Sequence, residues 1–408
     1  MVKALTRAHR WKRMLEEGRY ASIGEMAPGE KPPPSLGRHR LPPRFKLHPT
    51  HGRNAMNRRA LLAAPLLAPT LAASPFAPTS AAAQATGGVA TEEHMVPARD
   101  PGMQLYVRNK KPHAGVPARP DRTLLFVHGA TYPAHTAFDL PLGGMSWLDH
   151  IAGQGFDVWC MDLRGYGRST RPPEMSRPAD ESAPVVRGET AVQDIAAVAE
   201  FIRQRRDLPR LVHMGWSWGT VTMGRFAADN PDLVERLVLF APVWIRQGQA
   251  AVALAGPGQL GAYRTVARQQ ARERWMRGVP EDKKEGLVPP GWFEQWAEAT
   301  WATDPEGARQ NPPVLRAPNG VLQDLNEYFF AGRPYYDPAK ITAPTLLAVA
   351  EWDQDTPTYM AHTLFPLLTS SPGKRLVVLG EGTHTILMER NRMALFRTVQ
   401  SFLEEARA

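Results

Sequence analysis

The sequence predicts an α/β fold with a mainly parallel sheet, helices on both faces and an inserted helical cap. From residue 95 onward, short and continuous apolar runs alternate with longer helical segments. Such runs are typical of parallel strands buried on both faces, and their alternation with helices is typical of α/β proteins. The alternation stops within residues 245–341, where charged helical stretches and several tryptophans replace it. We therefore expect residues 84–244 and 342–408 to form the core and residues 245–341 to form the cap.

The expected strands share continuous or nearly continuous apolar runs. They are Gln104–Arg108, Thr123–His128, Asp157–Asp162, Leu211–Gly215, Arg236–Pro242, Thr345–Ala350 and Arg375–Leu379. Two helical segments show a one-sided apolar pattern. Within residues 190–205 the apolar residues are spaced by three and four positions, which marks one face of a helix. The last segment, around residues 395–403, shows the same spacing.

The composition is that of a globular protein, and its positive charge is local. The chain has 408 residues, of which 43% are hydrophobic and 22% are charged, and this excludes wholesale disorder. The net charge is +9, but residues 1–55 hold 12 Lys and Arg against 4 Asp and Glu, whereas residues 86–408 hold 35 against 36. The core has no global positive field that would attract phosphate, so we expect no nucleic-acid partner.

The first 83 residues have the composition of a leader and an export signal. Residues 1–55 are basic and contain a proline-rich run, so we expect a disordered leader or a mis-assigned start. Arg58 and Arg59 precede an apolar run that ends near the small residues Ala81-Ala82-Ala83, which is the layout of a signal peptide over residues 56–83. The arginine pair resembles a twin-arginine signal. An Ala/Pro-rich linker is the alternative.

This layout predicts that translation begins at Met56 and that the mature chain begins near Gln84. The precursor would need export machinery, and the mature protein would be periplasmic or secreted. No stretch reaches about 18 uninterrupted apolar residues, so we expect no stable membrane span.

The strongest local motif is Gly215-Trp216-Ser217-Trp218-Gly219, directly after an expected strand and before an expected helix. A G-x-S-x-G turn in this context holds a serine in strained backbone geometry above the sheet. The flanking glycines prevent side-chain collisions in the tight turn. The motif therefore predicts Ser217 as a nucleophile.

A serine hydroxyl needs a base, and His384 has the expected position. It follows the last expected strand and precedes the final helix, so it lies at the same sheet edge as Ser217. Two acids follow the strand Thr345–Ala350 and compete for the third role. We favour Asp353, which comes first after the strand, over Asp355, whose simpler role is to cap the next helix.

Two backbone N–H groups are candidates for stabilising a developing oxyanion. Ala130 follows the strand Thr123–Val127 through His128-Gly129, and Trp218 comes directly after the expected nucleophile. We expect His128 itself to support the loop.

These motifs together resemble the lid-bearing branch of the α/β-hydrolase superfamily, over residues 95–408. The motifs that carry the resemblance are His128-Gly129, Asp162-x-Arg164-Gly165-x-Gly167-x-Ser169, the Ser217 turn, the Asp353 loop and His384. The chain order of serine, acid and histidine is that of this superfamily. The resemblance implies an eight-stranded, mostly parallel sheet, no metal and no organic cofactor.

We therefore expect a serine hydrolase that cleaves a small carboxylic ester or a related acyl compound through an acyl-enzyme. The sequence Ser217-Trp218-Gly219 resembles the Ser-Trp-Gly turn of proline iminopeptidases, and such an aminopeptidase is an alternative. The oxyanion loop of those peptidases carries His-Gly-Gly-Pro-Gly, however, whereas this chain has His128-Gly129-Ala130-Thr131. A cofactor-free perhydrolase or haloperoxidase would use the same triad. Non-catalytic binding, or DNA association through the basic leader, are rivals from other classes.

Other residues give no sign of metal or phosphate chemistry. The single cysteine, Cys160, excludes an internal disulfide and a cysteine-rich zinc site, and its apolar surroundings predict a buried thiol. The sequence has no His-Glu-x-x-His motif and no Gly-x-x-x-x-Gly-Lys loop. The tryptophans of residues 245–341 would either line a substrate pocket or form the core of the cap.

Overall fold

The computed structural model describes residues 88–246 and 260–405. The chain divides into two units, residues 1–80 and 81–408, and all described residues belong to the second. The predicted leader at residues 1–55 and the predicted signal at residues 56–83 lie outside the described residues. None of the described helices is both long and apolar enough to span a bilayer.

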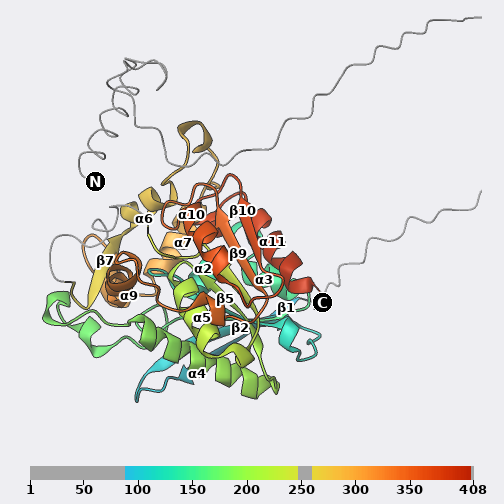
Figure 1. Cartoon of the computed structure of the whole chain (residues 1–408). Coiled ribbons are helices and arrows are strands. Elements are labelled where there is room, and N and C mark those ends of the chain that lie inside the picture. Colours follow the sequence, from blue (N-terminus) through green and yellow to red (C-terminus); the bar gives the residue numbers. More distant parts are fainter. Residues whose placement is uncertain (1–87, 247–259, 406–408) are drawn as a thin grey trace, which may run out of the picture. The chain divides into compact units, whose positions relative to one another are not determined.

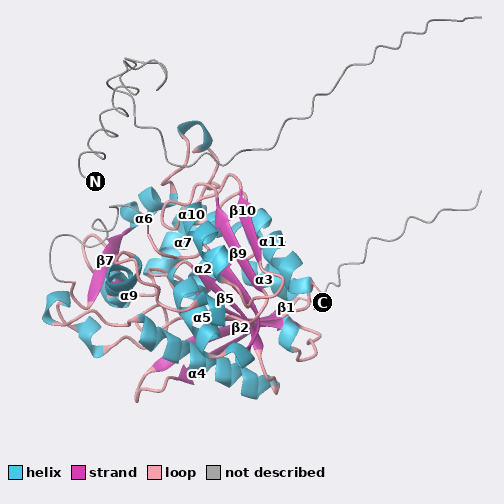
Figure 2. Ribbon diagram, in the orientation of Figure 1, coloured by secondary structure: helices cyan, strands magenta, loops and turns pink. Residues whose placement is uncertain are grey.

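The main sheet has eight strands in the order β1-β2-β4-β3-β5-β6-β9-β10 (Figures 1 and 2). The strands are β1 (Val89–Pro97), β2 (Gln104–Pro112), β3 (Thr123–Val127), β4 (Asp157–Met161), β5 (Leu211–Trp216), β6 (Val234–Phe240), β9 (Thr345–Ala350) and β10 (Arg375–Leu379). The pairs β1–β2 and β2–β4 are antiparallel and all others are parallel. The predicted α/β fold with a mostly parallel sheet is therefore confirmed.

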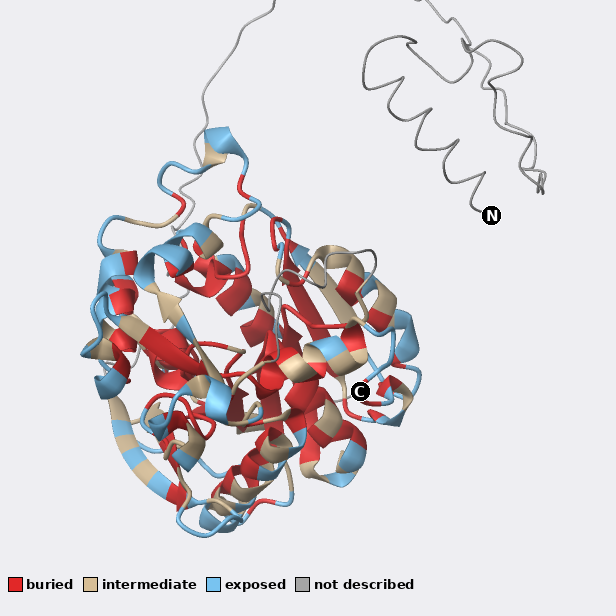
Figure 3. Ribbon diagram, turned by 90° about the vertical axis from the view of Figure 1, so that its left-hand side faces the viewer, coloured by how far each residue is buried: buried red, intermediate tan, exposed pale blue. Residues whose placement is uncertain are grey.

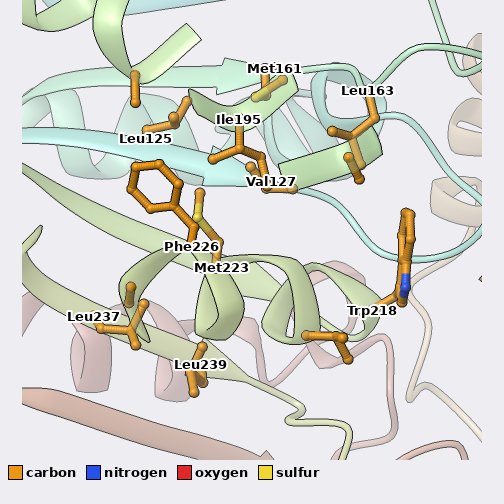
Figure 4. Packing of buried hydrophobic residues seen from close by; sticks show 14 of the residues in the cluster. Leu125, Val127, Met161, Leu163, Ile195, Trp218, Met223, Phe226, Leu237 and Leu239 are labelled. Atoms are coloured by element: carbon orange, nitrogen blue, oxygen red, sulfur yellow. The ribbon is translucent and has the colours of Figure 1, made fainter. Parts of the chain in front are cut away.

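The apolar runs of the central strands are continuous because both faces of the sheet are covered. Along β3, Leu125 and Val127 enter one core cluster, whereas Leu124 and Phe126 enter the other. This alternation is the two-residue period of a strand. Figure 4 shows Leu125 and Val127 packing with residues of the covering helices, such as Phe226. In Figure 3 buried residues fill the central strands, and exposed residues lie on the outer surfaces of the helices.

Helices cover both faces, as their one-sided apolar patterns require. On one face lie α4 (Gly188–Arg206), α5 (Trp218–Asp229) and α10 (Thr358–Leu364). On the other lie α2 (Ala134–Phe138), α3 (Trp147–Gly153) and α11 (Arg392–Glu404). The helices predicted within residues 190–205 and near residues 395–403 correspond to α4 and α11. Figure 1 shows α4 and α5 on the other side of the sheet from α3 and α11.

The insertion between β6 and β9 contains strands as well as helices, which corrects the expectation of a purely helical cap. Its elements are β7 (Tyr263–Ala267), α6 (Arg268–Trp275), α7 (Trp292–Trp301), α8 (Pro305–Ala308), β8 (Val314–Pro318), α9 (Gly320–Asp324) and the π-helical turn η8 (Leu325–Phe329). β7 and β8 form a separate antiparallel sheet in which Tyr263 pairs with Pro318. β7 is only half-buried, so it lacks the continuous apolar run by which strands were predicted.

The edge strand β1 was missed for a related reason. It pairs with β2 alone, and most of its side chains are half-buried or exposed. A strand with one partner and little burial carries polar residues such as Glu92 and Glu93, and its sequence does not show the pattern of a buried parallel strand.

Candidate active site

Ser217 occupies the turn between β5 and α5. Its backbone has φ 56° and ψ −124°, in a region that non-glycine residues rarely adopt. Its N–H donates to the Phe240 carbonyl of β6 at 3.0 Å, and its own carbonyl accepts from Thr220 N–H at 2.8 Å. The strained turn is thus held by hydrogen bonds on both sides, as a nucleophile-bearing turn requires.

The glycines beside Ser217 are required by close backbone approach. A Cβ at Gly215 would clash with the Gly219 carbonyl, and a Cβ at Gly219 would lie 2.6 Å from the His128 and Val127 carbonyl oxygens. The turn therefore packs directly against the end of β3. The loop after β3 is equally close, because a Cβ at Gly129 would lie 2.9 Å from Ser217 Cβ.

His384 and Asp353 form a direct hydrogen bond. His384 lies in the loop after β10, and its Nδ1 is 2.8 Å from Asp353 Oδ2 in the loop after β9. Both residues are buried, with exposed fractions of 5% and 1%. The bond assigns the proton of a neutral ring to Nδ1 and leaves Nε2 as the acceptor. This is the arrangement that a histidine needs to act as a base.

Three further donors fix the Asp353 carboxylate. Its Oδ1 accepts from the N–H groups of Asp355 and Thr356 at 2.9 and 2.8 Å, and its Oδ2 accepts from Thr356 Oγ1 at 2.7 Å. With the His384 bond, both oxygens have two partners each. The carboxylate is therefore held in one orientation toward the imidazole.

Asp355 does not cap a helix, so that expectation was wrong. The residue before α10 is Pro357, and no side chain accepts a hydrogen bond there. Asp355 instead pairs with Arg274 at 2.6 Å and with Arg277 at 3.1 Å, both from the cap. Burial would raise the pKa of this carboxyl, but the charge and hydrogen bond of Arg274, helped by the charge of His384, hold the pKa down at about 2.

Ser217 and His384 line the same cavity, together with Ala130, Trp216 and Trp275. Among the described residues no hydrogen bond joins Ser217 Oγ to the His384 ring, so the two groups share the cavity without a direct contact of that kind. A larger cavity of about 360 Å³ also reaches Ser217 and extends beneath the cap. Its size is within the range of small-molecule sites.

His128 sets the orientation of the first oxyanion candidate. Its Nε2 accepts from Leu163 N–H at 3.0 Å, so Nδ1 carries the proton and donates to the Gly129 carbonyl at 2.7 Å. Burial lowers the pKa of His128 to about 4, which keeps the ring neutral. The Gly129 carbonyl and the Ala130 N–H belong to one trans peptide and point in opposite directions. The bond from His128 therefore fixes the direction of the Ala130 N–H, and the expected supporting role of this histidine is confirmed.

The second oxyanion candidate is Trp218, the first residue of α5. Its N–H belongs to the first turn of the helix, where backbone donors have no intrahelical acceptor.

The Ala130 carbonyl, next to the first candidate, is held by two donors. It accepts from Tyr166 Oη at 3.0 Å and from Arg264 at 2.7 Å. Both candidate donors thus lie in segments whose neighbouring groups are fixed.

Several contributors to the site were not identified from the sequence. Trp216 Nε1 donates to the His384 carbonyl at 3.2 Å, and the two rings lie 5.4 Å apart. Trp216 is a variable position of the turn motif, so only its proximity to Ser217 could have indicated a role. Arg264 and Arg274 reach the site from the cap, and the basic composition of residues 264–277 was the only available signal.

Three cap tryptophans are buried in the core cluster that the cap shares with one face of the main sheet. Trp275, Trp296 and Trp301 have exposed fractions of 1% or less, and the rings of Trp275 and Trp296 are 4.6 Å apart. Trp275 also lines the cavity at Ser217, so it serves both of the roles considered. Cys160 is buried, as expected. Within the described ranges no group of three or more His, Cys, Asp or Glu side chains is arranged to hold a metal ion.

Glu389 is a buried carboxyl that ties together the residues on either side of His384. It accepts from Thr383 N–H at 3.2 Å, from Thr383 Oγ1, and from Thr385 Oγ1 at 3.2 Å. Burial and the nearby charge of Asp353 raise its pKa to about 7, although the threonine bonds act in the opposite direction. The loop that presents His384 is therefore anchored on a group that titrates near neutrality.

Comparison with known proteins identifies the family of this chain. The model of the alpha/beta hydrolase fold family matches residues 122–390, which is more than half of the chain. The chain belongs to the α/β-hydrolase family. It is 28% identical over 162 residues to lipase member K of Homo sapiens, and this match covers 38% of the chain and 40% of the lipase. The chain thus matches less than half the length of that hydrolase.

Solved structures of other hydrolases share the fold. A serine hydrolase involved in carbazole degradation has a TM-score of 0.52 and 15% identity, over 77% of this chain and 99% of that one. Potato (Solanum tuberosum) epoxide hydrolase I has a TM-score of 0.51 and 17% identity, over 77% of this chain and 99% of that one. At these identities the similarity shows the fold alone.

The raised pKa of Glu389 predicts a pH-dependent stability that Glu389→Gln removes. The folded state holds this proton more tightly than the unfolded chain, whose ordinary value is 4.5. Its contribution to stability is present below that value and is lost as the pH rises toward 7. Relative to the wild type, the variant should gain about 3 kcal/mol in free energy of unfolding between pH 4.5 and pH 8.

Urea unfolding at a series of pH values measures this difference. The exposed Glu285→Gln variant controls for the loss of one negative charge. Parallel curves for the wild type and Glu389→Gln would contradict the assignment.

Proposed function

We propose that this hydrolase cleaves a small carboxylic ester, or a related acyl compound, with Ser217, His384 and Asp353 as its catalytic triad. The observation that carries the proposal is the 2.8 Å His384–Asp353 bond beside a cavity that Ser217 also lines. With Nδ1 bonded to Asp353, Nε2 is the ring nitrogen that can accept a proton, and the serine stands at a strained turn after β5. Such catalytic hydrogen bonds commonly tighten only when substrate is bound.

The proposed reaction follows from these positions. Ser217 Oγ attacks the acyl carbon while His384 Nε2 takes its proton, and Asp353 stabilises the resulting imidazolium. The carbonyl oxygen becomes an oxyanion that the N–H groups of Ala130 and Trp218 stabilise. His384 then returns the proton to the departing alcohol. In the second half, water attacks the acyl-enzyme with His384 again as the base, and the carboxylic acid is released.

The charges of the larger cavity favour an ester substrate over the amine terminus of a peptide. An aminopeptidase needs an acidic group to bind the substrate ammonium. The carboxylate that lines this cavity, Asp355, is engaged by Arg274 and Arg277. Four arginines line the same space. We therefore propose the esterase activity and not the iminopeptidase activity that Trp218 had suggested.

Replacing Ser217 tests the nucleophile. Ser217→Ala should reduce kcat for a short-chain 4-nitrophenyl ester by at least about a thousandfold, because the acyl-enzyme cannot form. It should also abolish covalent labelling by a fluorophosphonate probe. Ser401→Ala, at an exposed serine of α11, is the matched control and should keep both activity and labelling. Wild-type turnover by Ser217→Ala would remove this residue from the mechanism.

The two neighbouring acids can be separated by substitution. Asp353→Asn should reduce kcat by about 10³- to 10⁴-fold, because the His384 proton then loses its carboxylate acceptor. Asp355→Asn leaves that bond in place and should reduce kcat far less. Steady-state kinetics on both variants measure the difference, and circular dichroism checks that both fold. A larger loss in Asp355→Asn would reverse the assignment.

We also propose that the protein is exported to the periplasm or secreted, on the strength of the signal-like composition of residues 56–83. N-terminal sequencing of the mature protein from its native host should find a start near Gln84. A mature chain that retains Trp11 would contradict both the export signal and a start at Met56.

A further inference from the structure

The cavity of about 360 Å³ beside Ser217 combines an apolar wall with an excess of positive charge. Its apolar lining includes Trp218, Trp244, Phe329, Phe330 and Met360. Its charged lining consists of four arginines, Arg246, Arg264, Arg274 and Arg277, and of one carboxylate, Asp355. One carboxylate cannot neutralise four guanidinium groups, so the cavity is positively charged.

The single carboxylate is already committed to two of these arginines. Asp355 Oδ2 lies 2.6 Å from Arg274 Nε, and Asp355 Oδ1 lies 3.1 Å from a terminal nitrogen of Arg277. This pairing is also what lowers the pKa of Asp355. Asp355 therefore does not neutralise the other two arginines of the cavity, Arg246 and Arg264.

Arg264, on β7, contacts only neutral oxygens in the part of the chain that the structure describes. Its guanidinium donates to the carbonyls of Ala130 at 2.7 Å and Pro318 at 2.6 Å, and to Thr131 Oγ1 at 3.0 Å. Burial lowers its pKa, and the charge of Arg274 acts in the same direction. A half-buried cation beside a second cation, with no carboxylate against it, is unfavourable unless an anion joins it.

Arg246, on the segment after β6, lies at the apolar part of the cavity. Its guanidinium carbon is 5.5 Å from the centre of the Phe330 ring. The carboxylate that lines this cavity, Asp355, pairs with Arg274 and Arg277 and not with Arg246. Arg246 and Arg264 thus line one cavity from two segments, and neither is paired with a carboxylate among the residues that the structure describes.

We propose that the substrate of this hydrolase carries an anionic oxygen group, a carboxylate or a phosphonate-type group, that binds at Arg264 and Arg246. The proposal rests on the esterase function proposed above and specifies its substrate class. Ser217 lines the same cavity, so one molecule can place its acyl carbon at the serine and its anion at the arginines. Guanidinium groups suit such anions because they donate charge-assisted hydrogen bonds. Arg264 contributes mainly its charge, since both of its terminal nitrogens already donate to neutral oxygens. The aromatic lining would hold the carbon chain between the two ends.

A matched pair of esters tests the preference. In 4-nitrophenyl hydrogen adipate the far end is a carboxylate, and in methyl 4-nitrophenyl adipate the same end is neutral. After subtraction of the uncatalysed rates, kcat/KM should be at least about tenfold higher for the anionic ester at low salt, since charge-assisted bonds are the stronger ones. The ratio should fall as salt is added. A ratio of one or below overturns the proposal.

Arginine substitutions locate the anion. Arg246→Gln and Arg264→Gln should each reduce the ratio of the two kcat/KM values by roughly tenfold. The ratio is the readout because Arg264 also holds the Ala130 carbonyl and its loss affects both esters. Arg272→Gln is the matched control, since Arg272 is an exposed residue of α6 that pairs with Glu294. If the ratio is unchanged in Arg246→Gln and Arg264→Gln, or falls equally in Arg272→Gln, the site is wrong.

Binding without turnover separates this proposal from the esterase function. In calorimetry on Ser217→Ala, monomethyl adipate should bind at least about tenfold more tightly than dimethyl adipate. Pentanoate and pentylphosphonate, with pentanol as the neutral reference, show which anion is preferred. Anion binding without ester hydrolysis by the wild type would support the subsite and overturn the esterase. Hydrolysis of both esters without any anion preference would overturn the subsite and leave the esterase standing.

Discussion

Between β5 and α5 the chain turns within a single residue, Ser217, whose φ is 56°. A non-glycine residue in such a conformation costs about 1–3 kcal/mol, and the cost is sustained only where the surroundings leave no alternative. Here β5 is paired on both sides, by β3 and by β6, and the Ser217 N–H is bonded to Phe240 of β6. The close contact of Gly219 with the end of β3 removes the remaining freedom. The position of the hydroxyl is thus a property of the sheet, and the loops around it are arranged toward that fixed point.

Each of the surrounding loops is held in place by hydrogen bonds of a buried polar side chain. His128 ties the Gly129 peptide to the loop after β4, Thr356 helps to hold Asp353, and Glu389 holds the threonines beside His384. Loops normally carry the mobility of a fold, whereas sites of acyl transfer need donors in fixed positions. The described bonds reconcile the two requirements, since they give each loop a rigid connection to the core. The cap contributes positive charge to the cavity, because its four lining arginines outnumber the one lining carboxylate, Asp355.

The sequence predicted the central part of this structure well because its signals are local there. β9 and β10 have the bounds that their apolar runs indicated. β9 is a central strand, and both of its faces are buried and apolar. Loops after parallel strands meet at one edge, so the proximity of His384 and Asp353 followed from topology. β1 and β7 were missed because partial burial leaves polar residues in them. β8 is mostly buried, but Arg316 interrupts its short apolar run. Asp355 was misassigned to a helix cap because its partners, Arg274 and Arg277, are separated from it by about 80 positions, and only tertiary packing brings them together.

Arg264 and Tyr166 donate to the same oxygen, the carbonyl of Ala130, one from the cap and the other from the core. The inserted segment and the catalytic framework are therefore not independent modules. A cap grafted from another member of the family would leave that oxygen with the tyrosine alone, and would disturb the Ala130–Thr131 peptide, next to the proposed oxyanion donor, as well as the shape of the pocket. When caps are exchanged between family members to change the substrate range, the new cap therefore has to carry an arginine at the position of Arg264.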